Sequence, residues 1–344
     1  MYVPVLKNRQ EELNALKALC SLPLSNKTLP LLEIVQTKSR SNSKKTLLQE
    51  LQETLGKNTT VMIDILNLKS HKKSKEAINE FFLQINKNPN YRLNLYDSLK
   101  PLKNFIPIIS YDPNNYDKLQ NEIQHDAYYL RNNFSKLGFR LKVKHFNDAL
   151  SEIKSVIQNE DIIILDIEHK KHTDFSIADL YNKINNLKES KNLTTFIINS
   201  VIPEDLTNKN MSDGHPISAI DNSLRDIYLS YGFDGFGDYT TIKSALPPSG
   251  GRISPGFIYY SYKSNKFIGF RGRFHKLDEF ENHIIPKLIS SKYWNNYPPI
   301  HHSNCSGCNH ILTLKNTSES ARSQGKWKQI SIKHYIYTMD KYLP

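Results

Sequence analysis

The sequence predicts an α/β protein, specifically a (β/α)8 TIM-like barrel, and three observations lead to this prediction. Eight short apolar segments recur through the first 240 residues, and most of them end in a polar or charged side chain. Stretches with helical periodicity lie between most of these segments. Continuous apolar runs are typical of strands buried on both faces of a parallel sheet, and alternation with helices is typical of the α/β class.

The first four expected strands are apolar runs with a polar side chain near the end. They cover residues 2–7 (YVPVLK), 29–36 (LPLLEIVQ), 60–66 (TVMIDIL) and 105–111 (FIPIISY). Leucines at helical spacing separate the first three strands, over residues 11–19 and 47–55. The long, lysine-rich stretch 67–104 separates the third strand from the fourth and has the weakest pattern.

The second four expected strands complete the repeat. They cover residues 138–144 (GFRLKVK), 161–168 (DIIILDIE), 194–201 (TTFIINSV) and 234–243 (DGFGDYTTIK). A helical pattern over residues 146–157 follows the first of these strands. The stretch 206–231, which precedes the last strand, is poorly patterned.

The chain length and a turn-rich segment predict two domains. A barrel of this kind needs about 250 residues, and the chain has 344. Residues 244–256 (SALPPSGGRISPG) are rich in proline and glycine and lack periodicity, which predicts a boundary there. We therefore expect a barrel over residues 1–244 and a smaller α+β extension with a β-hairpin over residues 245–344. The stretch around Arg252 is interpreted as a linker, with a phosphate-binding loop as the alternative.

Positive charge and aromatic side chains concentrate in the C-terminal extension. The chain has a net charge of +12, and residues 245–344 contribute 14 Lys or Arg, 5 Asp or Glu and 15 of the 36 aromatic residues. Basic side chains neutralise phosphates and rings stack on bases, so this composition predicts binding of nucleic acid or a nucleotide. The alternative is a small domain that needs aromatics for its core and lysines for solubility. The candidate nucleic-acid-binding residues are Lys142, Tyr239, Arg252, Lys266, Arg271, Arg273 and Trp327.

Charged side chains lie at the ends of the expected barrel strands, where barrels of this kind carry their active sites. Carboxylates inside apolar runs need a cation, a metal or several hydrogen-bond donors. They can hold Mg²⁺ or supply a general acid and base, with Lys142 and Arg140 binding an anion or pairing with the acids. The alternative is a salt-bridge network that satisfies itself. The candidate catalytic residues are Lys7, Glu33, Asp64, Asp166, Glu168 and Asp238.

Asp64 and Asp166 are the strongest candidates in this set and the expected Mg²⁺ ligands. Each is flanked by apolar residues on both sides and must point into the barrel or its mouth. Glu168 lies two residues beyond Asp166, which places both on the same side of an extended strand.

The segment HHSNCSGCNH at residues 301–310 has the residue types of a zinc site. A CxxC pair with two imidazoles makes a four-ligand set, which His301, His302, Cys305, Cys308 and His310 can supply, and Cys305, Cys308 and His302 are the favoured ligands. The chain has no second CxxC, so a segment without metal is the favoured interpretation. His334 is interpreted as a core histidine, with a distant ligand as the alternative.

Several segments resemble the Beta protein family, which is found in bacteria and on their phages, satellites and defence-type islands. The resemblance runs from Tyr2 to about Tyr337, and its most specific marks are FGDYT before a basic hairpin and a late WxxIxIxH. It implies a barrel protein in a context of phage resistance or superinfection immunity. Cys305 and Cys308 depart from the family pattern. The matching positions that the resemblance suggests as site or scaffold residues are Lys7, Asp64, Asp166, Asp238, Tyr239, Trp327 and His334.

Two functional hypotheses follow. In the first, the protein is a defence-associated barrel enzyme, a metal-assisted hydrolase, phosphodiesterase or nuclease, whose basic extension binds the nucleic acid or nucleotide. In the second, it is a non-catalytic module that binds nucleic acid or senses phage and signals to a partner protein. No apolar run approaches the roughly 20 residues needed to cross a bilayer, so we expect no membrane association and a cytoplasmic location.

Overall fold

The computed structural model describes residues 1–21, 25–38, 43–66, 76–88, 90–111, 121–246, 254–317 and 320–344. The chain forms two compact units. Unit 1 comprises Met1–Arg9, Leu29–Ser200 and Leu224–Asp238, and unit 2 comprises Gln10–Thr28, Val201–Ser223 and Tyr239–Pro344. The sequence-based boundary after residue 244 thus lies inside unit 2, which also takes in two earlier segments.

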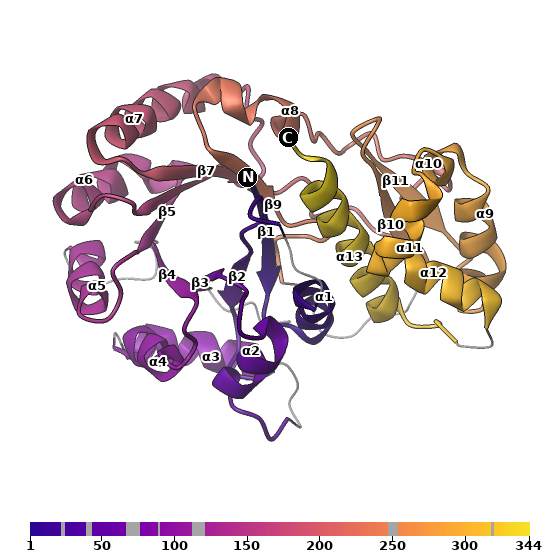
Figure 1. Cartoon of the computed structure of the whole chain (residues 1–344), viewed down its shortest axis with the longest axis horizontal. Helices are drawn as coiled ribbons and strands as arrows, with labels where there is room; N and C mark the ends of the chain where they lie inside the picture. Colours follow the sequence, from indigo (N-terminus) through magenta and orange to yellow (C-terminus); the bar gives the residue numbers. More distant parts are fainter. Residues whose placement is uncertain are drawn as a thin grey trace. The chain divides into compact units, whose positions relative to one another are not determined.

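Unit 1 is a closed barrel of eight parallel strands, which confirms the predicted fold class (Figure 1). Their order around the barrel is the order along the chain, and β9 closes the barrel by pairing with β1. Each expected strand is present, although most are shorter at one or both ends. The strands are β1 (Tyr2–Lys7), β2 (Leu31–Ile34), β3 (Val61–Ile65), β4 (Phe105–Ser110), β5 (Gly138–Lys142), β6 (Ile162–Asp166), β7 (Thr194–Asn199) and β9 (Gly235–Asp238).

Amphipathic helices surround the barrel strands in Figure 1. In α2, for example, Leu47, Leu51 and Leu55 are buried. Its first turn is fixed by Thr46 and Gln49, whose side chains each accept a hydrogen bond from the other residue's backbone N–H. The helices of unit 1 are α2 (Leu47–Leu55), α3 (Glu76–Lys87), α4 (Tyr91–Leu99), α5 (Glu122–Arg131), α6 (Phe146–Val156), α7 (Phe175–Lys191) and α8 (Leu224–Ile227), with 3₁₀ turns at Val143–His145 and Tyr228–Tyr231.

The strand ends differ from the prediction at two sites. The chain turns into a 3₁₀ helix directly after Lys142, so Lys144 is not part of β5. After Asp166 the backbone leaves the extended conformation, and Glu168 has a positive φ of 53°. The Asp166 carboxylate accepts a hydrogen bond from the Glu168 N–H at 2.9 Å, which holds this turn. Glu168 therefore does not continue the strand alternation that the sequence suggested.

Unit 2 is built on a small antiparallel sheet and a helical layer. Strands β10 (Gly256–Ser261) and β11 (Lys266–Arg271) form the expected hairpin, and β8 (His215–Pro216) adds to β11. One face of the hairpin carries Phe257 and Tyr259 into an aromatic core that also includes Trp327. The other helices of this unit are α1 (Gln10–Cys20), α9 (Ile285–Ile289), α10 (Lys292–Asn295), α11 (Pro299–Asn304), α12 (Ser306–Asn316) and α13 (Gln324–Tyr342), and a π-helical turn spans Phe280–Ile284.

Helix α13 is the central element of unit 2 and packs against α1, α12 and β10. Its buried face includes Trp327, Ile330 and His334, while Lys326 and Lys341 lie outside that face. Of the helices in the described ranges, α13 included, none combines the length and the apolar character that a membrane span requires.

Candidate functional site

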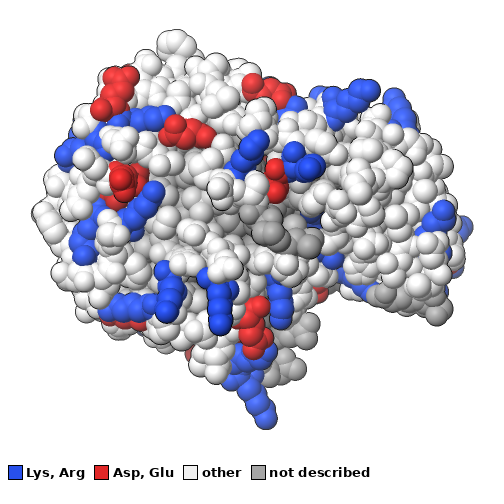
Figure 2. Space-filling view, viewed as in Figure 1, with Lys and Arg blue, Asp and Glu red and all other residues white. Residues whose placement is uncertain are grey.

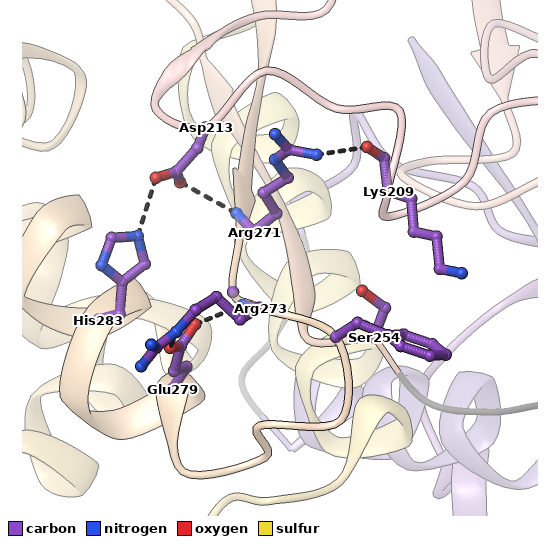
Figure 3. A pocket seen from close by; sticks show the side chains of 9 residues that line it. Lys209, Asp213, Ser254, Arg271, Arg273, Glu279 and His283 are labelled. Carbon is purple, nitrogen blue, oxygen red and sulfur yellow. Dashed lines mark hydrogen bonds and ion pairs between the residues drawn. The ribbon is translucent and has the colours of Figure 1, made fainter.

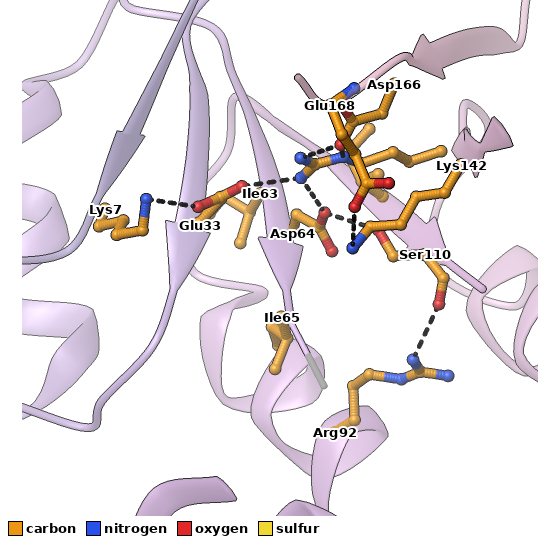
Figure 4. A network of polar contacts seen from close by, with 12 residues as sticks. Lys7, Glu33, Ile63, Asp64, Ile65, Arg92, Ser110, Lys142, Asp166 and Glu168 are labelled. Carbon is orange, nitrogen blue, oxygen red and sulfur yellow. Dashed lines mark hydrogen bonds and ion pairs between the residues drawn. The ribbon is translucent and has the colours of Figure 1, made fainter. Parts of the chain in front are cut away.

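Three of the five predicted acids, Glu33, Asp64 and Asp166, lie near one another at the barrel mouth (Figure 4). They share one guanidinium group, that of Arg140 in β5. Arg140 Nη1 donates to Glu33 Oε1 at 2.9 Å and to Asp64 Oδ2 at 3.0 Å. Its Nη2 and Nε donate to Asp166 Oδ2 at 2.7 and 3.1 Å. The closed barrel brings these side chains together because the ends of β2, β3, β5 and β6 meet at the same rim.

Two further side chains complete this network, which we call the Arg140 network. Lys7 Nζ lies 3.2 Å from Glu33 Oε2, and the Ser110 hydroxyl donates to Asp64 Oδ2 at 2.6 Å. Glu33, Asp64, Asp166, Lys7 and Arg140 are all at most 2% exposed. Three carboxyl groups thus share a buried space with the basic side chains of Lys7 and Arg140.

The surroundings of Asp64 shift the pKa of its carboxyl group. Burial raises the pKa of Asp64, and the nearby Glu33 charge adds to this, while Arg140 and the Ser110 hydroxyl act in the opposite direction. Asp64 Oδ1 has no hydrogen-bond partner in the described part of the chain. A raised pKa favours the protonated, uncharged form of the buried Asp64 carboxyl.

The remaining predicted barrel residues lie around this network. Lys142 Nζ is 3.4 Å from Glu168 Oε1, and the Glu168 side chain is about half exposed. Asp238, at the end of β9, accepts a hydrogen bond from the Tyr2 hydroxyl at 2.9 Å and is buried. The Glu168 side chain is thus about half exposed and paired with Lys142, whereas Asp166 is buried and paired with Arg140. The two do not form a buried pair of carboxylates.

A second group of predicted residues lines an open cavity of about 680 Å³ in unit 2, which we call the Arg271 pocket. Figure 3 shows the Arg271 side chain, at the end of β11, turned toward Lys209, with the Arg271 backbone N–H on Asp213 and with Arg273 beside Glu279. Arg271 Nη1 donates to the Lys209 carbonyl at 2.5 Å, and Arg273 pairs with Glu279. Besides Arg271 and Arg273, the lining residues are Lys209, Asp213, Ser254, Gly272, Phe274, Glu279 and His283.

An aromatic ring and a cation lie together in this pocket. Phe274 is 40% exposed, and Lys209 Nζ lies 3.9 Å from the centre of its ring. In the view of Figure 2, the charged side chains over the sheet and helices of unit 2 are mostly Lys and Arg, whereas both signs alternate over the barrel helices. The sequence singled out Arg271 and Arg273 but missed Lys209 and Phe274, whose proximity depends on the fold.

Of the other expected nucleic-acid-binding residues, those that the structure describes do not line the Arg271 pocket. Lys266 is exposed at the opposite end of β11. Tyr239 and Trp327 are buried, and Trp327 stacks on Phe280 and donates its ring N–H to the Ala321 carbonyl. The prediction that Trp327 stacks on a base is therefore corrected, because its ring is part of the core. Arg252 lies outside the described residues.

The CxxC pair forms a cluster with His301 and His334, whereas the sequence favoured His302 as the ligand beside the two cysteines. His301, Cys305, Cys308 and His334 place one ligand atom each within 4.8 Å of one another, and all four are buried. His302 instead stacks on Trp294, with ring centres 4.0 Å apart and an interplanar angle of 3°. His301 in α11 and His334 in α13 therefore lie beside the two cysteines, where the sequence suggested His302.

Comparison with known proteins gives a family. The model of a family described as Beta protein matches residues 2–340, nearly the whole chain. No curated protein matches this chain.

Proposed function

Because the chain belongs to the Beta protein family, whose description names no reaction, we propose a function from the geometry: the Arg271 pocket of unit 2 binds a nucleic acid or a nucleotide. The observation that carries this proposal is the exposed Phe274 ring beside three cationic side chains. An accessible ring stacks on a base, and Lys or Arg neutralises the adjoining phosphates.

The charges of the pocket support a phosphate ligand. Lys209, Arg271 and Arg273 contribute three positive charges, against two negative charges from Asp213 and Glu279. Asp213 is already engaged by His283 at 2.8 Å and by Lys287 at 2.6 Å. Glu279 is engaged by Arg273. The acids are thus held within the pocket wall, and Lys209 and Arg271 present the uncompensated charge.

A role of this binding in anti-phage defence or immunity, in the cytoplasm and with a partner protein, is part of the same proposal. It follows from the family resemblance of the sequence. In this role, unit 2 binds the nucleic acid or nucleotide, and the partner protein transmits the signal.

The experiment is a titration of fluorescently labelled single-stranded oligonucleotides, DNA and RNA, followed by anisotropy. Phe274→Ala is expected to weaken binding by about 1–3 kcal/mol, because it removes the stacking ring. Arg271→Ala is expected to lower the slope of log K against log salt by about 1, because it removes one phosphate contact. Affinity that does not change between low and physiological salt contradicts the proposal.

The matched control is Lys263→Ala, which removes an exposed lysine from the turn between β10 and β11. Arg271 and Lys263 belong to the same hairpin but to its opposite ends. Equal losses in the two variants would indicate a diffuse charge effect and not a defined pocket.

A second candidate function is acid–base chemistry at the barrel mouth, as in a hydrolase, phosphodiesterase or nuclease. The raised pKa of buried Asp64 favours it, since a protonated carboxyl is a general acid. Mg²⁺ is less well supported, because one oxygen of each of Glu33, Asp64 and Asp166 already binds Arg140. Asp166→Asn and Asp64→Asn should abolish hydrolysis of an oligonucleotide, with or without Mg²⁺, while leaving its affinity intact.

A further inference from the structure

We propose that unit 2 contains a structural zinc site whose four ligands are His301, Cys305, Cys308 and His334. A tetrahedral Zn²⁺ with sulfur and nitrogen ligands separates its ligand atoms by about 3.3–3.8 Å. Cys308 Sγ lies 3.3 Å and Cys305 Sγ 3.7 Å from His334 Nδ1. All four ligand atoms lie within 4.8 Å of one another, so the set needs little movement to surround one ion.

The local sequence forms the first half of this site. Cys305 caps the N-terminus of α12, and its Sγ accepts a hydrogen bond from the Cys308 N–H at 3.4 Å. This turn points both sulfurs to the same side. His301 lies in the preceding short helix, α11, with three residues between it and Cys305.

His334 supplies the second half from α13, and its tautomer is fixed. Its Nε2 lies 2.9 Å from the Tyr260 carbonyl oxygen, which only accepts hydrogen bonds, so Nε2 carries the proton. In the neutral ring, Nδ1 then presents a lone pair toward the two sulfurs. A backbone carbonyl that orients a histidine in this way is typical of metal ligands. The Tyr259 ring, stacked on His334 at 4.2 Å and 8°, holds the imidazole in place.

His301 is held in a comparable way. Its ring stacks on Tyr297, with ring centres 4.1 Å apart, and also lies near the Tyr342 ring, at 5.6 Å. Its Nδ1 is 3.2 Å from the Tyr342 hydroxyl. Its Nε2 is buried and has no hydrogen-bond partner among the residues that the structure describes. A buried ring nitrogen without a partner is costly, and coordination to a metal removes that cost.

Burial defines the type of site. The four residues are at most 2% exposed and lie within the aromatic core of unit 2. Four protein ligands in a closed environment are the arrangement of a structural zinc, since a catalytic zinc keeps one position for water or substrate. The same burial argues against a redox role for the CxxC pair, because a thiol–disulfide exchange partner has no access to either sulfur.

The first experiment measures metal in the full chain, expressed without a histidine tag and purified without chelators. We expect about one zinc per chain by elemental analysis. Growth with Co²⁺ should give the intense visible absorption of tetrahedral cobalt with thiolate ligands. A chain without zinc, with or without a Cys305–Cys308 disulfide in unreduced peptides, overturns the proposal.

The second experiment tests the ligand set with matched variants. Cys308→Ser and His334→Asn should reduce the zinc content at least tenfold. His302→Asn and Cys20→Ser should retain it, because His302 stacks on Trp294 and Cys20 lies outside the cluster. Loss of zinc in His302→Asn with retention in His334→Asn overturns the assignment. If the ligand variants do not fold, the cobalt spectrum of the wild-type chain still decides, because octahedral cobalt without thiolate absorption is incompatible with this ligand set.

Discussion

The Arg140 network of the barrel and the Cys/His cluster of unit 2 are both buried groups of reactive side chains, but they differ in where their positive charge comes from. The barrel carboxyls bind a guanidinium supplied by β5. In the Cys/His cluster (His301, Cys305, Cys308 and His334), Cys305 Sγ accepts the Cys308 backbone N–H, and both sulfurs face the unprotonated Nδ1 of His334. The barrel thus supplies its own cation for the hard oxygen ligands, whereas the soft sulfur ligands face a ring nitrogen that can itself bind a metal.

This difference separates two kinds of buried site. Carboxylates around a guanidinium make a salt-bridge network that fixes the barrel mouth, and removal of one partner leaves unpaired charge. Thiolates, formed as the cysteines lose their protons to solvent on metal binding, and neutral imidazoles are ligands that Zn²⁺ prefers. The comparison therefore predicts that the barrel depends on Arg140 and that unit 2 depends on a metal.

The largest effect is expected from Arg140→Met, which keeps most of the side-chain length and removes the charge. Glu33, Asp64 and Asp166 would lose the guanidinium that they share, so the free energy of unfolding should fall by about 3–5 kcal/mol. Urea unfolding followed by far-ultraviolet circular dichroism measures this loss.

The control for this variant is Lys45→Met. Lys45 pairs with Glu53 at 2.5 Å, but both side chains are about half exposed, so the loss should stay below about 1 kcal/mol. Equal losses in free energy of unfolding in the two variants would contradict this comparison, because the barrel acids would then not depend on Arg140.

The sequence predicted the barrel well because each strand is a continuous apolar run, and the closed topology alone aligns their ends. It therefore placed Glu33, Asp64 and Asp166 at one rim. It did not identify Arg140 as the centre of the network, since the choice among several basic residues depends on strand register and side-chain length. Glu168 was misplaced because the sequence does not show that β6 ends at Asp166.

The Cys/His cluster shows a second limit. Its nearby ligands, Cys305 and Cys308, are visible as a motif, but His334 lies 26 residues after Cys308. His301 and His302 are adjacent in sequence, and only the orientation of α11 decides which of them faces the sulfurs. Pairing across helices is a tertiary property, so spacing alone favoured the wrong histidine.

A chelator should affect unit 2 through the proposed zinc site. Zinc held at about a hundred times its Kd contributes about 2.7 kcal/mol to stability, and a chelator removes this contribution. Trp294 and Trp327 both belong to the core of unit 2, so tryptophan fluorescence during urea unfolding measures the effect. Arg140→Met should show the same chelator-dependent difference, and its absence in the wild-type chain would remove the metal from the comparison.

A smaller effect is expected from Asp64→Asn, and it depends on pH. The folded-state pKa of Asp64 is raised above the unfolded value of 3.8, so its stabilising contribution is complete below pH 3.8 and is lost as the pH rises through the folded pKa. The asparagine variant lacks this dependence. The difference between wild type and variant should change by up to about 1.4 kcal/mol per pH unit in that interval. A pH-independent difference would mean that folding does not raise the pKa of Asp64.

The smallest effect is expected from the Lys142–Glu168 pair at the barrel mouth. Its side chains are 25% and 48% exposed and 3.4 Å apart, so water and salt screen their attraction. A double-mutant cycle with Lys142→Met and Glu168→Gln should give a coupling energy below about 1 kcal/mol, and less at high salt. A coupling that is larger and insensitive to salt would place this pair with Arg140 in the buried network. The buried network would then extend to Lys142 at the end of β5 and to Glu168, two residues beyond the end of β6.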